Sequence, residues 1–98
     1  MTRGLSIDYL YSHIMSSLME ASRLAQEGRF SSSVQALEQQ VAAVGMSYPL
    51  ASNLAALHLQ LGDTSAATSY CAIAIALDPY CHTAYFNRFL CYCKSQTK

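Results

Sequence analysis

Residues 49–79 read PLASNLAALHLQLGDTSAATSYCAIAIALDP, and they contain the clearest helical pattern of the chain. Pro49 is tolerated in the first turn of a helix, where its missing N–H is not needed, and Gly62 is typical of a helix end. Between these two residues leucines recur at three- and four-residue steps, which predicts one apolar helical face. These leucines are Leu50, Leu54, Leu57 and Leu61.

The second half of the stretch predicts another helix, which Asp63 or Thr64 caps and which stops at Asp78 and Pro79. Its side chains fall into two neighbouring rows at helical spacing. Small residues in one of these rows allow another helix to approach closely. The first row holds Ala66, Tyr70, Ile73 and Leu77, and the second holds Ala67, Cys71 and Ala74.

The same signals extend the pattern to five helices. A first helix is predicted over residues 7–27 and ends at Gly28, and a second is capped by Ser31 and closed by Gly45. A fifth is predicted over residues 81–94. The stripes are Ile7, Leu10, Ile14, Leu18, Ala21 and Ala25 in the first helix, Val34, Leu37, Val41 and Val44 in the second, and Tyr85, Phe89 and Tyr92 beside Phe86, Leu90 and Cys93 in the fifth.

Two helix ends repeat at a fixed interval. Gly28 and Gly62 are 34 residues apart, and Ala21 and Ala55 keep the same offset. A helix-turn-helix unit of about 34 residues is the period of tetratricopeptide repeats. Because one helical hairpin cannot bury both of its apolar faces alone, neighbouring hairpins of this kind must stack.

The segment 48–79 resembles a tetratricopeptide repeat closely, although Ala51 and His58 stand where the family usually has larger or aromatic side chains. The segment 14–45 resembles a degenerate repeat, and residues 81–94 resemble the first helix of another. The closer match is carried by Leu54, Ala55, Gly62, Asp63, Ala67, Ala74, Leu77, Asp78 and Pro79. The weaker one is carried by Ala21, Leu24, Gly28, Phe30 and Leu37, with Glu20, Ser33 and Gln40 as departures.

The resemblance implies an all-α fold. Antiparallel helical hairpins are expected to stack as a short right-handed superhelix of about five helices. The chain of 98 residues is expected to form a single domain, 1–98, made of the repeat-like segment 14–45, the repeat 48–79 and the extra helix 81–94.

Composition excludes several classes of function. Six basic and six acidic residues give no net charge, so the basic surface that binds nucleic acid is missing. No apolar run approaches the roughly 18 residues of a membrane span, and the N-terminus lacks a signal-peptide core. The four cysteines are interpreted as apolar core residues rather than disulfides. We therefore expect an intracellular, cytoplasmic protein with no membrane insertion.

No chemistry-bearing constellation stands out in the sequence. The cysteines and His82 lack a C-x-x-C pair, and Cys91 and Cys93 project to different sides of one helix, which argues against zinc. Each of the three histidines is isolated from a nucleophile and an acid partner. We therefore predict no catalytic, metal or cofactor-binding residues, and no enzyme.

Charged residues are scarce in the middle of the chain, where Asp63 is the only one from Gln39 to Leu77. Either part of this surface meets another protein surface, or the uncharged exterior simply faces water. The predicted fifth helix is apolar around most of its circumference, which is poor chemistry for the capping end of a repeat array. A partner protein, a second copy or neighbouring repeats are expected to cover it.

In the family that this chain resembles, the first helices of successive repeats line a concave groove. The resemblance thus implies a non-enzymatic interaction module or scaffold segment, which binds a protein or a neutral peptide through this groove or through the apolar end helix. The alternative is an architectural or self-association segment of a larger assembly. The implied partner-binding residues are Met19, Ser22, Gln26, Asn53, Ala56, Gln60, Phe86, Asn87, Leu90 and Lys94.

Overall fold

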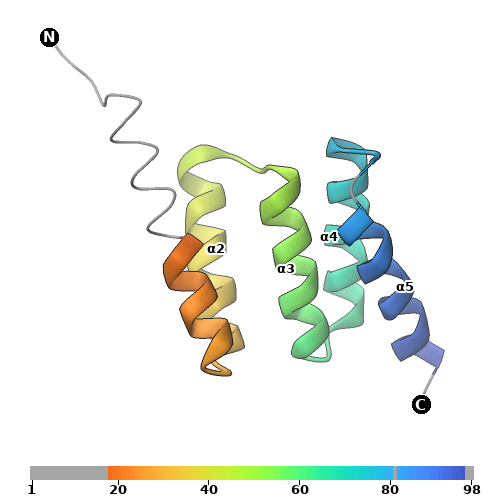
Figure 1. The fold of residues 1–98 in the computed structure, drawn as a ribbon, viewed down its shortest axis with the longest axis horizontal. Coiled ribbons are helices and arrows are strands. Elements are labelled where there is room, and N and C mark those ends of the chain that lie inside the picture. Colours follow the sequence, from red (N-terminus) through yellow and green to blue (C-terminus); the bar gives the residue numbers. More distant parts are fainter. Residues whose placement is uncertain (1–17, 81, 97–98) are drawn as a thin grey trace, which may run out of the picture.

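The computed structural model describes residues 18–80 and 82–96, and all regular secondary structure in these two ranges is helical. The helices lie side by side, and each runs antiparallel to the one before it (Figure 1). The all-α class with five helices is therefore confirmed for this part of the chain, whereas residues 7–17 of the predicted first helix lie outside it. The helical segments are 18–26, α2 (Phe30–Val44), α3 (Tyr48–Gln60), α4 (Thr64–Leu77) and α5 (His82–Gln96).

Two of the turns between helices have the same backbone geometry. Gly28 and Gly62 have φ angles of 79° and 82°, in the left-handed region that glycine adopts without strain. In both turns the glycine N–H donates to the carbonyl three residues earlier, and the next N–H donates to the carbonyl five residues earlier. This pair of bonds is the Schellman motif. Helix ends predicted 34 residues apart are thus built alike.

The helix starts follow the predictions less closely. Asp63 caps α4, because its carboxylate accepts a backbone N–H of the first turn at 3.1 Å. The prediction that Ser31 caps α2 is wrong, since Arg29 holds the N-cap position and makes no side-chain cap bond. The Schellman turn leads directly into α2, so that the Ser33 N–H already donates to the Arg29 carbonyl at 3.0 Å.

α3 lies in the middle of the described protein, in contact with α2, α4 and α5. Leu50, Leu54 and Leu57 are buried on it, as predicted. Leu61 is 43% exposed instead, because it occupies the C-cap position beyond the last regular turn. The buried part of the predicted leucine stripe therefore ends at Leu57 and does not include Leu61.

α4 lies between α3 and α5 and packs through its small side chains. Ala67, Cys71 and Ala74 are completely buried, whereas Ile73 and Leu77 of the other predicted row are exposed. A helix held between two neighbours at short range has room for alanine but little room for isoleucine or leucine. The buried face of α4 is therefore the row of small residues.

The two departures from the tetratricopeptide pattern have distinct packing roles. Ala51 is buried against Ala74 and Ala84, so that α3, α4 and α5 meet through three alanines. His58 stacks on Tyr70, with ring centroids 5.5 Å apart and ring planes inclined by 14°. Because the side chains around Ala51 are small, α5 can pack closely against both helices of the preceding hairpin.

Candidate partner-binding groove

α5 is attached to the rest of the described protein through one narrow face. The buried side chains of this face are Ala84, Asn87 and Cys91. The side-chain amide of Asn87 donates a hydrogen bond of 3.2 Å to the carbonyl of Ser52 in α3. This buried bond fixes the rotation of α5 about its axis, and so it determines which side chains point outward.

The outward side chains of α5 are mostly aromatic. Tyr85, Phe86, Phe89 and Tyr92 are 41%, 60%, 61% and 64% exposed. The expectation that the preceding hairpin cannot cover all of these rings is therefore confirmed. Exposed aromatic clusters of this kind usually mark a contact surface.

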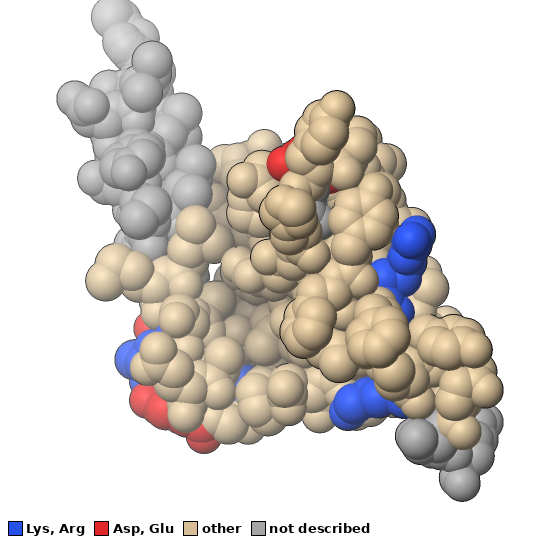
Figure 2. Space-filling model, turned by 45° about the vertical axis from the view of Figure 1, so that its right-hand side comes forward, with Lys and Arg blue, Asp and Glu red and all other residues tan. Residues whose placement is uncertain are grey.

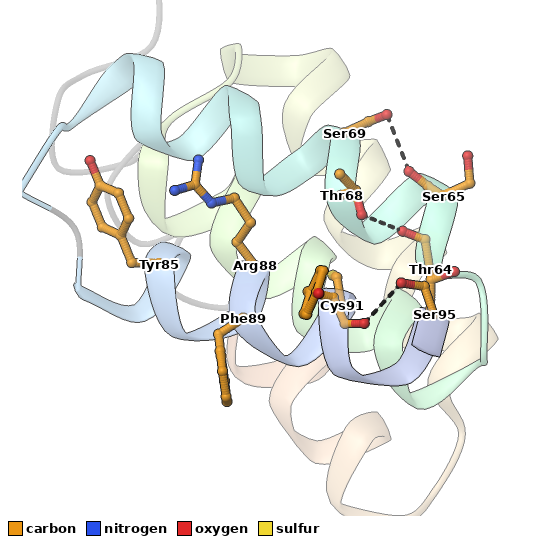
Figure 3. A pocket seen from close by; sticks show the side chains of 10 residues that line it. Thr64, Ser65, Thr68, Ser69, Tyr85, Arg88, Phe89, Cys91 and Ser95 are labelled. Carbon is orange, nitrogen blue, oxygen red and sulfur yellow. Dashed lines mark hydrogen bonds between the residues drawn. The ribbon is translucent and has the colours of Figure 1, made fainter. Parts of the chain in front are cut away.

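A groove of about 840 Å³ runs between α4 and α5. On the α5 side it is lined by Tyr85, Phe89 and Tyr92, which we call the aromatic ridge. On the α4 side it is lined by a trough of small hydroxyl side chains (Figure 3). The trough consists of Thr64, Ser65, Thr68 and Ser69, and Arg88, Cys91 and Ser95 of α5 complete the lining.

Several hydroxyl groups of the groove are satisfied within their own helices. Thr68 donates to the Thr64 carbonyl at 2.8 Å, and Ser69 donates to the Ser65 carbonyl at 3.2 Å (Figure 3). Ser95 likewise donates to a carbonyl one turn earlier, at 2.9 Å. The trough is therefore an uncharged surface of small side chains beside the aromatic ridge. The shape suits bulky apolar side chains of a partner better than a small polar ligand.

The groove has one charged side chain in its lining, Arg88. Its guanidinium lies 5.3 Å from the ring centroid of Tyr85, in a cation–π arrangement, and Figure 3 shows it extending from α5 toward α4. No carboxylate lines the groove in the described part of the chain. Figure 2 shows that most of the face on the α5 side is uncharged, with small separate basic patches.

The site offers little reactive chemistry. Within residues 18–80 and 82–96, no three His, Cys, Asp or Glu side chains are placed to hold a metal ion. Burial, together with the neighbouring Cys91 thiol, raises the pKa of Cys71 to about 11, which keeps this thiol protonated at neutral pH. No helix in the same residues is long and apolar enough to cross a bilayer.

A second, smaller cleft brings together three of the residues expected to bind a partner. Ser22, Asn53 and Ala56 line a cavity of about 310 Å³ between the segment 18–26, α2 and α3. Its floor is apolar and includes Leu37 and Leu57. A cavity of this size has room for one or two side chains of a peptide rather than for a whole helix.

The other expected residues do not gather at this cleft. Met19, Gln26, Gln60 and Phe86 are exposed outside it, and Leu90 is half-buried against the core. Lys94 is exposed, and its ammonium group donates to the Leu59 carbonyl at 3.2 Å. The placement of Asn87 on an open wall is wrong, because it is 5% exposed and its amide is bonded to α3.

Sequence reasoning missed most of the α4–α5 groove. The resemblance directed attention to the first helix of each repeat, whereas the trough belongs to α4, the second helix of its hairpin. One signal was available in the sequence: Thr64 and Thr68, and likewise Ser65 and Ser69, stand four residues apart. Residues at this spacing share one helix face.

The comparisons with known proteins do not assign this chain to a family. No protein-family model matches it, and no curated protein is significantly similar to it.

Proposed function

We propose that this chain is a protein-interaction module of the tetratricopeptide type, and that its α4–α5 groove receives a helix of a partner protein. The observation that carries this proposal is the aromatic ridge, whose three rings are at least 41% exposed beside a trough of small side chains. Amphipathic helices bind in such grooves through a few apolar anchors. Phe89 and Tyr92 are the residues that we expect to contribute most.

Two features support the tetratricopeptide part of the proposal. Schellman turns end two helices 34 residues apart, at Gly28 and Gly62. α5 also packs on α3, the helix two before it, as the first helix of a following repeat does in a stacked array. A right-handed superhelix with a concave wall is therefore part of the proposal, and the cleft beside Asn53 would hold a side chain of a neutral peptide.

The charge of the groove defines the chemistry of the partner. Within the part of the chain that the structure describes, Arg88 is the only charged side chain in the lining, and no carboxylate there neutralises it. A partner helix with an apolar stripe and one Asp or Glu opposite Arg88 is thus complementary in both shape and charge. We place this binding in the cytoplasm and assign the chain no catalytic role.

Self-association is the second candidate function, and the same exposed rings favour it. The aromatic ridge of one copy fits the trough of another, because large side chains face small ones across a two-fold axis. In that case the partner helix is α5 of a second copy.

Site-specific photocrosslinking distinguishes these functions. A benzophenone side chain at position 89 should give a covalent adduct with the partner in cells, whereas one at the exposed position of Gln35 in α2 should give none. An adduct of twice the mass of the chain would identify a second copy. Equal labelling at both positions, or none at position 89, would contradict the proposal.

A further inference from the structure

Two cysteines meet across the interface between α4 and α5. Cys71 of α4 and Cys91 of α5 are free thiols, and both belong to the buried cluster formed with Ala55, Leu59 and Ala67. They are 0% and 3% exposed, and Cys91 is near enough to contribute to the raised pKa of Cys71. Two thiols that come from neighbouring helices and lie in one buried cluster are a pair that can be joined covalently.

We propose that Cys71 and Cys91 form a reversible disulfide that ties α5 to α4. Such a bond requires the two backbones to approach closely, with Cα atoms usually about 4.4–6.8 Å apart. Small residues let helices approach closely, and the cluster that holds the two cysteines is built from small residues such as Ala55 and Ala67. α4 and α5 also meet through Ala74 and Ala84 in a neighbouring cluster. The inference does not depend on what the groove binds.

A small-molecule disulfide such as oxidised glutathione is the oxidant that we assign to this step. Cys91 is one of the residues that line the groove, so we assign the first step to it: its thiolate attacks one sulfur of the oxidant and releases one reduced glutathione. The Cys71 thiolate then attacks the Cys91 sulfur and releases the second. The two protein thiols lose two protons and two electrons in total, and the oxidant takes up both.

The environment of the pair makes this reaction slow in the reduced, folded protein. Burial and the adjacent Cys91 thiol raise the pKa of Cys71, while the guanidinium of Arg88 acts weakly in the opposite direction. Because the thiolate is the nucleophile, the rate should increase with pH. In a reducing compartment the pair stays as thiols, and under oxidising conditions the bond holds α5, and with it the aromatic ridge, in place.

The test uses the full chain with Cys81→Ser and Cys93→Ser, which leaves only the proposed pair. On incubation with oxidised glutathione, both thiols should disappear, the mass should fall by two hydrogen atoms, and the product should remain a single chain. The melting temperature should rise by roughly 10 °C, and a dithiol should reverse the change. The matched control adds Cys71→Ala, so that the remaining Cys91 can only accept one glutathione.

If the serine variant does not fold, the wild-type chain answers the same question. Trypsin cleaves after Arg29, Arg88 and Lys94, so the disulfide should link peptide 30–88 to peptide 89–94. Chymotryptic subdigestion then separates Cys91 from Cys93, which lie on either side of Tyr92. Two thiols that stay reduced, or that each carry glutathione, would overturn the proposal, and so would a link through Cys81 or Cys93.

Discussion

At Gly62 the backbone turns from α3 into α4 with a φ angle of 82°, and no atom lies within 4 Å of the position that a Cβ would take. A side chain there is strained by the backbone and not by a clash. We expect Gly62→Val to lower the free energy of unfolding by about 1–2 kcal/mol in urea titrations. Gly62→Asn should cost less, since asparagine tolerates this region. Equal stability of the valine variant and wild type would refute the assignment.

Cys71 links the stability of the protein to alkaline pH. Burial, and then its Cys91 neighbour, raises the pKa of Cys71 from 9.0 to about 11, so the folded state keeps a proton that the unfolded chain has lost. The resulting stabilisation is complete below pH 9.0 and is lost as the pH rises through about 11. The loss should be on the order of 2 kcal/mol.

Denaturant titrations of the reduced protein from pH 8 to 11 measure this effect. Burial also raises the pKa of Tyr70 above its ordinary 10.0, so this phenol also lowers the stability at high pH. The free energy of unfolding of wild type is therefore compared with that of Cys71→Ala at each pH. In Cys71→Ala only Tyr70 should lower the stability at high pH, so the difference between the two proteins measures the contribution of Cys71. Identical pH profiles for the two proteins would show that the Cys71 proton is not coupled to folding.

At the scale of the elements, α4 depends on having no side chain larger than cysteine on its buried face. Ala67 is completely buried beside Cys71 and Cys91, so Ala67→Leu should overpack this site and lower the free energy of unfolding by about 1–3 kcal/mol. Ala72→Leu on the exposed face of the same helix is the matched control and should change it by less than about 0.5 kcal/mol. Similar values for the two variants would mean that α4 packs through another face.

α5 depends on one buried polar contact with α3. Asn87→Ala removes the donor to the Ser52 carbonyl and leaves that acceptor without this partner, so we expect a loss of about 1–3 kcal/mol in thermal or urea unfolding. Asn53, which stands 34 residues earlier, is exposed, and Asn53→Ala should be nearly neutral. If both asparagines prove neutral, the hydrogen bond does not hold α5.

Asn53 and Asn87 also show which features of the fold can be predicted from the sequence and which cannot. Helix ends at Gly28, Gly45 and Gly62 were predictable because glycine is the residue that most readily adopts a left-handed backbone. Asn87 faces inward because of the way α5 is rotated against α3. The alanine contact among α3, α4 and α5 favours this rotation, and the Asn87 bond then fixes it. Helical periodicity predicts which residues share a face of a helix, but it does not predict which neighbouring helix that face contacts.

In the described molecule as a whole, the ion pairs between arginines and carboxylates lie in and next to the segment 18–26, at the end opposite α5 (Figure 1). Arg23 pairs with Glu20 at 2.6 Å and with Glu27 at 2.7 Å, and Arg29 lies 3.6 Å from Glu27. Within the described residues, Arg88 is the one charged side chain that lines the α4–α5 groove. An uncharged stretch was visible in the sequence, but its position beside the aromatic ridge could be known only once α4 and α5 were placed. This asymmetry gives the molecule one solvated end and one end suited to contact.

Sedimentation of the isolated chain over a wide concentration range tests whether the aromatic ridge is a contact surface. With no partner present, we expect reversible self-association that Phe89→Ser with Tyr92→Ser abolishes while the helical content is retained. These positions serve better than Leu90, which packs against the buried cluster around Cys71. Ile73→Ser with Leu77→Ser, on the exposed side of α4 outside the groove, should leave the association unchanged. A monodisperse wild-type monomer at every concentration would contradict the assignment of the aromatic ridge as a contact surface.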